Sequence, residues 1–154
     1  MLMTMNLKSK YPEYLEYHAQ STWDGKTGGI STVSDDRQMV YDTPKTYGGR
    51  GEGICPDEIF VTAVLGCLNN TFLDFQRRFE LELKSLNFNG KATAKFDGEG
   101  YKIESLSVSC DVVVAEGELE TGQRCVELMR EYCHLTRSIK SCIPIIYSTS
   151  VSER

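Results

Sequence analysis

The 154-residue sequence predicts an α+β fold, because predicted strands and predicted helices occur in separate groups along the chain. Alternating, β-branched or turn-bounded segments predict strands over residues 15–23, 30–33, 38–41, 84–96 and 103–114. A long amphipathic segment separates the third strand from the fourth. We expect one domain over residues 1–154, with residues 1–10 as a loosely ordered N-terminus.

Turn residues punctuate the first group of predicted strands. Residues 24–29 (DGKTGG) supply a turn after the first strand. Residues 44–53 form a glycine-rich loop, but they lack the strand–turn–helix context and the Gly-Lys-Ser/Thr ending of a phosphate cradle. We therefore predict an ordinary loop there.

The strongest predicted helix runs from Pro56 to about Phe79. Pro56 suits the first helical position, and Asp57 and Glu58 favour the positive end of the helix dipole. Apolar residues then recur with a period close to 3.6 at Phe60, Val64, Leu68, Phe72 and Phe75. Such an apolar helix is expected to be central and largely buried.

The remaining elements follow from turn and capping signals. Residues 97–100 (DGEG) predict a hairpin turn. A second helix is expected to open at Thr121 or Gly122, a short one to cover residues 135–142, and a last strand to cover residues 145–151.

Composition excludes several functional classes. The net charge of −5 disfavours binding to a phosphate backbone, so no nucleic-acid partner is expected. No apolar run approaches the roughly 20 residues that cross a bilayer, so no membrane partner is expected either. The N-terminus lacks the apolar region of a secretory signal, which predicts a cytoplasmic protein.

Six cysteines require an explanation. They are Cys55, Cys67, Cys110, Cys125, Cys133 and Cys142. No two have C-x-x-C spacing, so the sequence signals neither a zinc site nor a thioredoxin-like motif. A reducing cytoplasm disfavours structural disulfides, and most of the six are expected to be small buried hydrophobes.

Cys67 and Cys133 have the most suggestive surroundings. Cys67 follows Gly66 on the inner stripe of the long helix, where a small residue lets a substrate or backbone approach; the alternative is a buried cysteine packed like alanine. Cys133 falls between two predicted helices, with His134 and Arg137 nearby. If Cys133 opens a helix, backbone N–H groups stabilise its thiolate; the alternative is a helix-end cysteine without a partner.

These residues resemble the OsmC/Ohr superfamily of thiol-dependent peroxidases over nearly the whole chain. Residues 19–25 (AQSTWDG) look like its first hairpin with a W-x-G turn, and residues 56–59 (PDEI), followed by Cys67, look like its P-E-x-L segment and first cysteine. Residues 133–136 (CHLT) resemble its second motif, C-P-x-S, and residues 143–147 resemble its closing strand.

The resemblance implies an OsmC-like fold: an intertwined homodimer whose curved antiparallel sheets surround two long central helices. It also implies catalytic roles. Cys67 would be the peroxidatic thiolate and Cys133 the resolving thiol, while Asp57 would take the place of the family's glutamate. Arg50 resembles the loop arginine that such a carboxylate holds beside the sulfur, where a cation lowers the thiol pKa.

The sequence departs from the family pattern at three positions. Asp57 is one methylene shorter than glutamate, His134 replaces the proline after the second cysteine, and Arg50 lies in a loop of different length. Arg37 is the alternative arginine. Cys142 is a possible substitute resolving thiol but is expected mainly in the core.

The resulting hypothesis is a peroxidase that reduces organic hydroperoxides, and also hydrogen peroxide, in oxidative-stress defence. It would need no cofactor, only an external dithiol such as a lipoyl protein or a thioredoxin-like protein. The alternative is a binding or redox-sensing protein that holds a small lipid-like ligand near Cys67. A metal site on Cys133 and His134 is disfavoured, because adjacent residues rarely ligate one metal.

Overall fold

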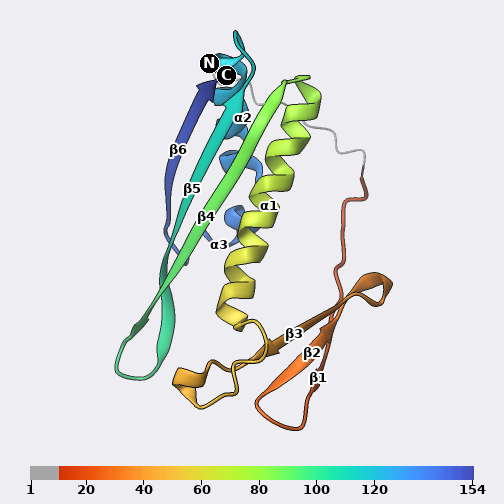
Figure 1. Cartoon of the computed structure of the whole chain (residues 1–154), viewed down its shortest axis with the longest axis vertical. Coiled ribbons are helices and arrows are strands. Elements are labelled where there is room, and N and C mark those ends of the chain that lie inside the picture. Colours follow the sequence, from red (N-terminus) through yellow and green to blue (C-terminus); the bar gives the residue numbers. More distant parts are fainter. Residues whose placement is uncertain (1–10) are drawn as a thin grey trace. The chain divides into compact units, whose positions relative to one another are not determined.

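A computed structural model describes residues 11–154, and Figure 1 shows the arrangement of its elements. Within this range the chain divides into two compact units, one that ends at Cys55 and one over Pro56–Arg154. Each unit is described by itself below. The expectation for residues 1–10 lies outside the described residues.

The N-terminal unit is an antiparallel meander of three strands in the order β1-β2-β3, namely β1 (Gln20–Trp23), β2 (Gly28–Thr32) and β3 (Gln38–Asp42). The predicted turn joins β1 to β2. Asp24 Oδ1 accepts hydrogen bonds from the backbone N–H groups of Lys26 (2.8 Å) and Gly28 (3.2 Å). Short 3₁₀ turns at Ser34–Asp36 and Lys45–Tyr47 occupy the connections that follow β2 and β3.

A single buried carboxylate organises the N-terminal unit. Asp42 is 2% exposed and accepts hydrogen bonds from the Thr27 hydroxyl (2.6 Å) and from the backbone N–H groups of Thr43 (2.8 Å) and Glu52 (3.0 Å). These bonds lower the pKa of Asp42, with the Thr27 hydroxyl as the largest cause. The carboxylate therefore ties the glycine-rich loop back onto β3.

The long helix is present as predicted: α1 (Pro56–Arg78) begins with Pro56 and carries acidic residues in its first turn. Its buried side chains are Val64, Leu68, Phe72 and Phe75. They form one stripe with helical spacing, whereas Ala63 and Gly66 on another side are exposed. The expectation of a largely buried helix thus holds for one face of α1 in the single chain.

The C-terminal unit contains a second three-stranded sheet in the order β4-β5-β6, formed by β4 (Leu83–Phe96), β5 (Tyr101–Val114) and β6 (Ile145–Glu153). The predicted turn joins β4 to β5, and Asp97 N–H donates to the Gly100 carbonyl at 3.0 Å. β6 runs parallel to β5, so this sheet is mixed rather than wholly antiparallel.

A helical crossover makes the parallel β5–β6 pair possible, since parallel neighbours cannot be joined by a tight turn. It consists of α2 (Leu119–Tyr132) and α3 (His134–Ile139). α2 begins two residues before the predicted start, because Glu153 Oε1 accepts hydrogen bonds from the N–H groups of Gly117 and Leu119, both at 3.0 Å. α3 ends before residue 142, where a turn follows.

The hydrophobic core of the C-terminal unit lies between the helices and one face of the sheet. β5 supplies alternate buried residues to it: Leu106, Val108, Cys110, Val112 and Val114. The inner faces of α1 and α2 complete the core, with α1 beside β4 in Figure 1. This alternation is typical of a sheet covered on one side.

The α+β prediction is confirmed, and the core fixes the backbone that positions Cys67 and Cys133.

Among the helices in residues 11–154, none combines the length and apolar character needed to cross a membrane.

Candidate functional site: two thiols and an imidazole

Cys67 is held near the middle of α1, directly before the fully buried Leu68. Its side chain is half-buried, so the sulfur belongs to the boundary between the core and the surface. The backbone carbonyl of Cys67 accepts a hydrogen bond from the Thr71 hydroxyl at 2.8 Å, one turn later. The thiol therefore sits on a rigid element rather than on a loop.

Cys133 lies at the junction of α2 and α3, where its backbone is extended (φ −61°, ψ 113°). Cys133 therefore opens α3, which is the first of the two alternatives that the sequence leaves open for this residue. The side chain is fully buried, and its sulfur lies 3.2 Å from Cys67 Sγ. Both residues are free thiols, since bonded sulfurs are about 2.05 Å apart.

His134 completes a three-residue cluster with the two thiols. Its Nδ1 lies 3.6 Å and its Nε2 3.8 Å from Cys67 Sγ, and its side chain is exposed. The sequence places His134 near Cys133, but its contact with Cys67 was not predicted. The sequence feature that could have indicated this contact is the histidine at position 134, where the family that the sequence resembles has proline.

The local environment holds Cys67 as a thiol. Burial raises the pKa of Cys67 above its usual value, and the neighbouring Cys133 raises it further. The backbone N–H of Leu135 and the hydroxyl of Thr71 lower it, without reversing the shift. Because the thiolate is the nucleophile, reaction at neutral pH requires a group that removes this proton.

The other four cysteines have different environments. Burial raises the pKa of Cys110 to about 12 and that of Cys125 to about 11, so both are inert core residues, as expected. Cys55 is half-buried. Cys142 is exposed, so its expected place in the core is wrong: α3 has ended and the chain turns at the surface there. Cys133 is the thiol that contacts Cys67.

Asp57 lies in the first turn of α1, ten residues before Cys67, which corresponds to about 15 Å of helix. It lines a cavity of about 420 Å³ between α1 and β4, together with Val61, Leu65 and Lys91. Leu65 and Cys67 are two residues apart and so point to nearly opposite sides of the helix. Asp57 and Cys67 therefore face different surroundings within this unit.

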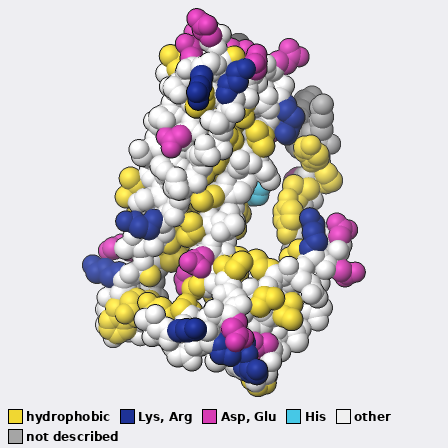
Figure 2. All heavy atoms as spheres, viewed as in Figure 1, with side chains coloured by type: hydrophobic (Ala, Val, Ile, Leu, Met, Phe, Trp, Pro, Cys, Tyr) yellow, Lys and Arg dark blue, Asp and Glu magenta, His cyan; other side chains and the backbone are white. Residues whose placement is uncertain are grey.

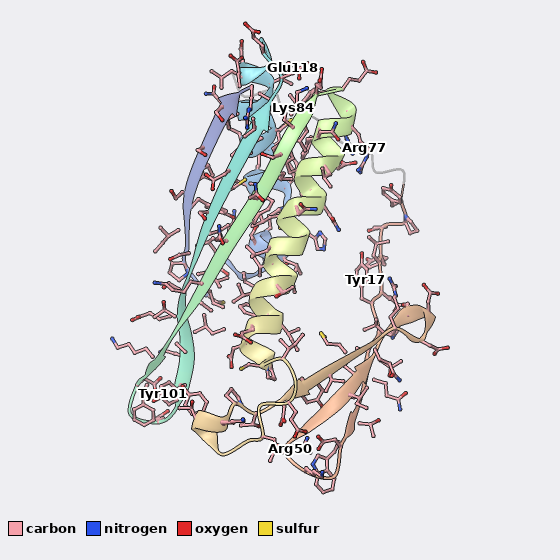
Figure 3. All side chains as sticks on the ribbon, viewed as in Figure 1. Tyr17, Arg50, Arg77, Lys84, Tyr101 and Glu118 are labelled. Atoms are coloured by element: carbon pink, nitrogen blue, oxygen red, sulfur yellow. The ribbon has the colours of Figure 1, made fainter. Side chains whose placement is uncertain are left out.

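Arg50, which Figure 3 labels, lies in the N-terminal unit and is surrounded by three carboxylates. Its guanidinium group pairs with Asp24, and its Nε lies 3.5 Å from Asp42 Oδ2 and 3.4 Å from Glu52 Oε2. Arg37, the alternative arginine, pairs with exposed Asp35 at 3.6 Å. Cys67 and Asp57 belong to the other unit, so the expected pairing of Arg50 with Asp57 stays a prediction.

Within residues 11–154, no group of three or more His, Cys, Asp or Glu side chains converges in a way that would hold a metal ion. The side chains that the site brings together are two free sulfurs in contact and one imidazole. Two such thiols can exchange between the reduced state and a disulfide with little movement of the backbone.

Comparisons with known proteins agree with this fold. A model of the family described as "OsmC-like protein" matches residues 49–148. A hypothetical protein from Aquifex aeolicus VF5 superimposes with a TM-score of 0.74 at 14% identity, over 92% of this chain and 99% of that chain. Comparison with curated proteins finds no match.

Two further solved structures carry functional descriptions. One is an organic hydroperoxide resistance protein OsmC from Legionella pneumophila, with a TM-score of 0.67 and 15% identity over 92% of this chain and 99% of that chain. The other is an organic hydroperoxide resistance protein from Elizabethkingia anophelis, with a TM-score of 0.68 and 15% identity over 92% of this chain and 98% of that chain. At such identities the likeness shows the fold.

Proposed function

This chain belongs to the OsmC-like protein family, and from that premise we propose that it is a thiol-dependent peroxidase that reduces organic hydroperoxides. The observation that carries the proposal is the contact between two free sulfurs, Cys67 Sγ and Cys133 Sγ, at 3.2 Å. Structural neighbours described as organic hydroperoxide resistance proteins support this substrate class. Hydrogen peroxide, which has the same O–O bond, is a second substrate.

The proposed reaction has two chemical steps. The Cys67 thiolate attacks the terminal oxygen of R–O–O–H, the O–O bond breaks, and R–O⁻ leaves and takes up a proton to become an alcohol. Cys67 is oxidised to a sulfenic acid. Cys133 then attacks that sulfur, which releases water and forms the Cys67–Cys133 disulfide. The half-buried Cys67 reacts with the peroxide first, and the buried Cys133 then reacts with the oxidised Cys67.

An external dithiol closes the cycle. It reduces the disulfide to two thiols and becomes a disulfide itself, so no bound cofactor is needed. We propose a lipoyl protein or a thioredoxin-like protein as the physiological source of the dithiol. A cytoplasmic location and a role in oxidative-stress defence complete the proposal, since a reducing compartment keeps the thiols of this chain reduced.

We propose that the functional form is a homodimer. In the N-terminal unit large apolar side chains gather at the surface (Figure 2), including Tyr11, Tyr14, Tyr17, Trp23, Ile30, Val40, Tyr47 and Ile54. Three short strands cannot bury these side chains against each other, and exposed apolar patches mark interaction sites. A second copy of the chain is the occupant that the family resemblance implies.

Within that homodimer, Arg50 and Asp57 have proposed supporting roles. Arg50 would stabilise negative charge on the Cys67 sulfur and on the leaving oxygen, and Asp57 would orient its guanidinium group. Arg50 is held as a cation by the three carboxylates around it, Asp24, Asp42 and Glu52. A D57E variant tests directly whether the shorter side chain of Asp57 limits this arrangement.

The decisive experiment follows peroxide consumption with dihydrolipoamide as reductant. C67S is expected to lose activity at least about a hundredfold, because serine cannot form a sulfenic acid. C142S, which alters an exposed thiol outside the cluster, is the matched control and is expected to retain wild-type turnover. Undiminished turnover in C67S would overturn the proposal.

A further inference from the structure

We propose that His134 is the catalytic base of the site: its imidazole removes the proton from the Cys67 thiol and returns it to the departing alkoxide. This inference rests on the proposed function, which it deepens by naming the proton carrier. It also assigns a role to the residue at which the chain departs from the family's second motif.

The geometry of the imidazole supports the assignment. Both ring nitrogens lie within reach of Cys67 Sγ, at 3.6 Å for Nδ1 and 3.8 Å for Nε2, so the ring packs against the sulfur. The residue is anchored at the first position of α3, where the Ser138 hydroxyl donates to its carbonyl at 2.7 Å. Such contacts at sulfur are within the range of a hydrogen bond that tightens when substrate binds.

The environment of the Cys67 thiol makes a proton acceptor necessary. Burial raises the pKa of Cys67, so the unassisted thiol is protonated at neutral pH. Its other contacts in the described C-terminal unit are the Cys133 thiol, the Thr71 hydroxyl and the Leu135 N–H. None of these three groups is a base near neutral pH, whereas an imidazole is.

The proton balance of the step is closed. Neutral His134 takes the proton of Cys67, which leaves a thiolate beside an imidazolium. The thiolate attacks the terminal peroxide oxygen, the O–O bond breaks, and the imidazolium donates its proton to R–O⁻. The net reaction is Cys67–SH plus ROOH giving Cys67–SOH plus ROH, and His134 ends neutral.

The ionisable group that the structure places in contact with His134 is a thiol. Cys67 faces it from α1. On its own helix the next charged residue is Arg137, three residues later, while near the end of α2 the guanidinium group of Arg130 lies over the Tyr147 ring, 4.6 Å from its centroid. The contact of the imidazole ring with Cys67 Sγ is therefore the one through which His134 accepts the proton.

The test measures the rate of alkylation of Cys67 by iodoacetamide against pH, by peptide mass spectrometry, in a C55S/C133S/C142S background. The variant is H134Q, which keeps a polar side chain but cannot exchange protons. The chain has two histidines, and H18Q, an exposed position in the N-terminal unit, is the matched control. In the otherwise wild-type chain, the same variants are assayed for peroxide reduction.

H134Q is expected to move the midpoint of the alkylation curve up by about one pH unit and to slow peroxide reduction at pH 7 at least about tenfold. H18Q is expected to match the parent chain in both assays. An unchanged midpoint in H134Q overturns the assignment. If H134Q fails to fold, the NMR titration of the His134 ring in wild type and C67S replaces it; identical titration in the two proteins also overturns it.

The two proposals fail in different ways. If the parent chain consumes no peroxide but H134Q still shifts the alkylation midpoint, the thiol–imidazole pair stands and the peroxidase proposal falls. If H134Q reduces peroxide at the wild-type rate while C67S is inactive, the peroxidase stands and His134 is only a neighbour.

Discussion

Cys133 Sγ lies 3.2 Å from Cys67 Sγ, about 1 Å beyond the length of a disulfide bond. Closing this gap requires only small side-chain rotations, since Cys133 is already oriented toward α1. The two free thiols therefore already lie in the arrangement that disulfide formation requires.

The first prediction concerns the product of one equivalent of tert-butyl hydroperoxide. In the wild-type protein, mass spectrometry is expected to find a disulfide that joins the peptides of Cys67 and Cys133. In C133S the reaction is expected to stop at the sulfenic acid, so dimedone labels Cys67 stoichiometrically. A disulfide to Cys142 in the wild type would contradict the assignment of the resolving thiol.

The second prediction concerns acid stability of the N-terminal unit. The pKa of Asp42 is lowered by hydrogen bonds to its carboxylate, so its contribution is present above the ordinary aspartate pKa and is lost as the pH falls through the lowered value. D42N is expected to melt at a lower temperature than wild type at neutral pH and to converge with it in acid.

Trp23 provides the readout for that experiment. It is the single tryptophan of the chain, and its Nε1 donates to the Lys26 carbonyl at 3.0 Å within the same unit. Its fluorescence therefore follows the N-terminal unit. A difference in melting temperature between D42N and wild type that stays the same at every pH would count against the role of Asp42.

The third prediction concerns the cap of α2. Glu153 Oε1 accepts hydrogen bonds from the N–H groups of Gly117 and Leu119. E153A is expected to lower the free energy of unfolding by about 1 kcal/mol, as for the loss of a helix cap, and E153Q, which keeps an acceptor, by less. Urea denaturation measures both. E104Q, which alters an exposed pair with Lys95, is the control and should change little.

The same cap shows what sequence reasoning can and cannot reach. α1 was predicted almost to the residue, because Pro56, the acidic first turn and the apolar period are all local signals. Local signals predict a start of α2 that is two residues too late, because the cap of this helix comes from Glu153, more than thirty residues later in the chain. Contacts of that range leave no local pattern.

The candidate site divides in the same way. Local sequence indicates that Cys133 lies between two helices and leaves open whether it opens the second, and its pairing with Cys67 follows from resemblance alone, since the two cysteines are 66 positions apart. The carboxylates around Arg50 and the ring of His134 against Cys67 were not predicted for the same reason. The exposure of Cys142 followed from the early end of α3.

The fourth prediction concerns alkaline stability. The folded chain holds Cys110 and Cys125 protonated up to pKa values of about 12 and about 11, whereas in the unfolded chain these thiols ionise at ordinary values. The unfolded state therefore binds fewer protons, and stability falls as the pH rises. Each thiol contributes a slope of up to about 1.4 kcal/mol per pH unit in that window.

Urea denaturation between pH 8 and pH 11 measures this slope. The C110A/C125A variant is expected to be less stable throughout, because it leaves small cavities in the core, but to show a shallower decline with pH. C142A, at an exposed thiol, is the matched control and should keep the wild-type slope. Equal slopes in all three proteins would contradict the prediction.

The last prediction uses Gly66 to test the proposed homodimer. A methyl group at Gly66 meets no atom within 4 Å in the single chain, and alanine is favoured over glycine inside a helix by roughly 1 kcal/mol. In an isolated chain G66A should therefore be stabilising. If instead a second copy packs closely on this exposed side of α1, the added methyl groups overpack the interface, which typically costs about 1–3 kcal/mol.

We expect the second result, because the family resemblance implies a homodimer with two long central helices, and we propose that these helices pack against each other. Sedimentation equilibrium should show weaker self-association for G66A than for wild type, and dilution should lower its melting temperature more steeply. G98A, at an exposed hairpin turn with equally open surroundings but positive φ, is expected to lower stability without changing self-association. A monodisperse G66A dimer that melts above wild type would show that α1 does not carry the contact.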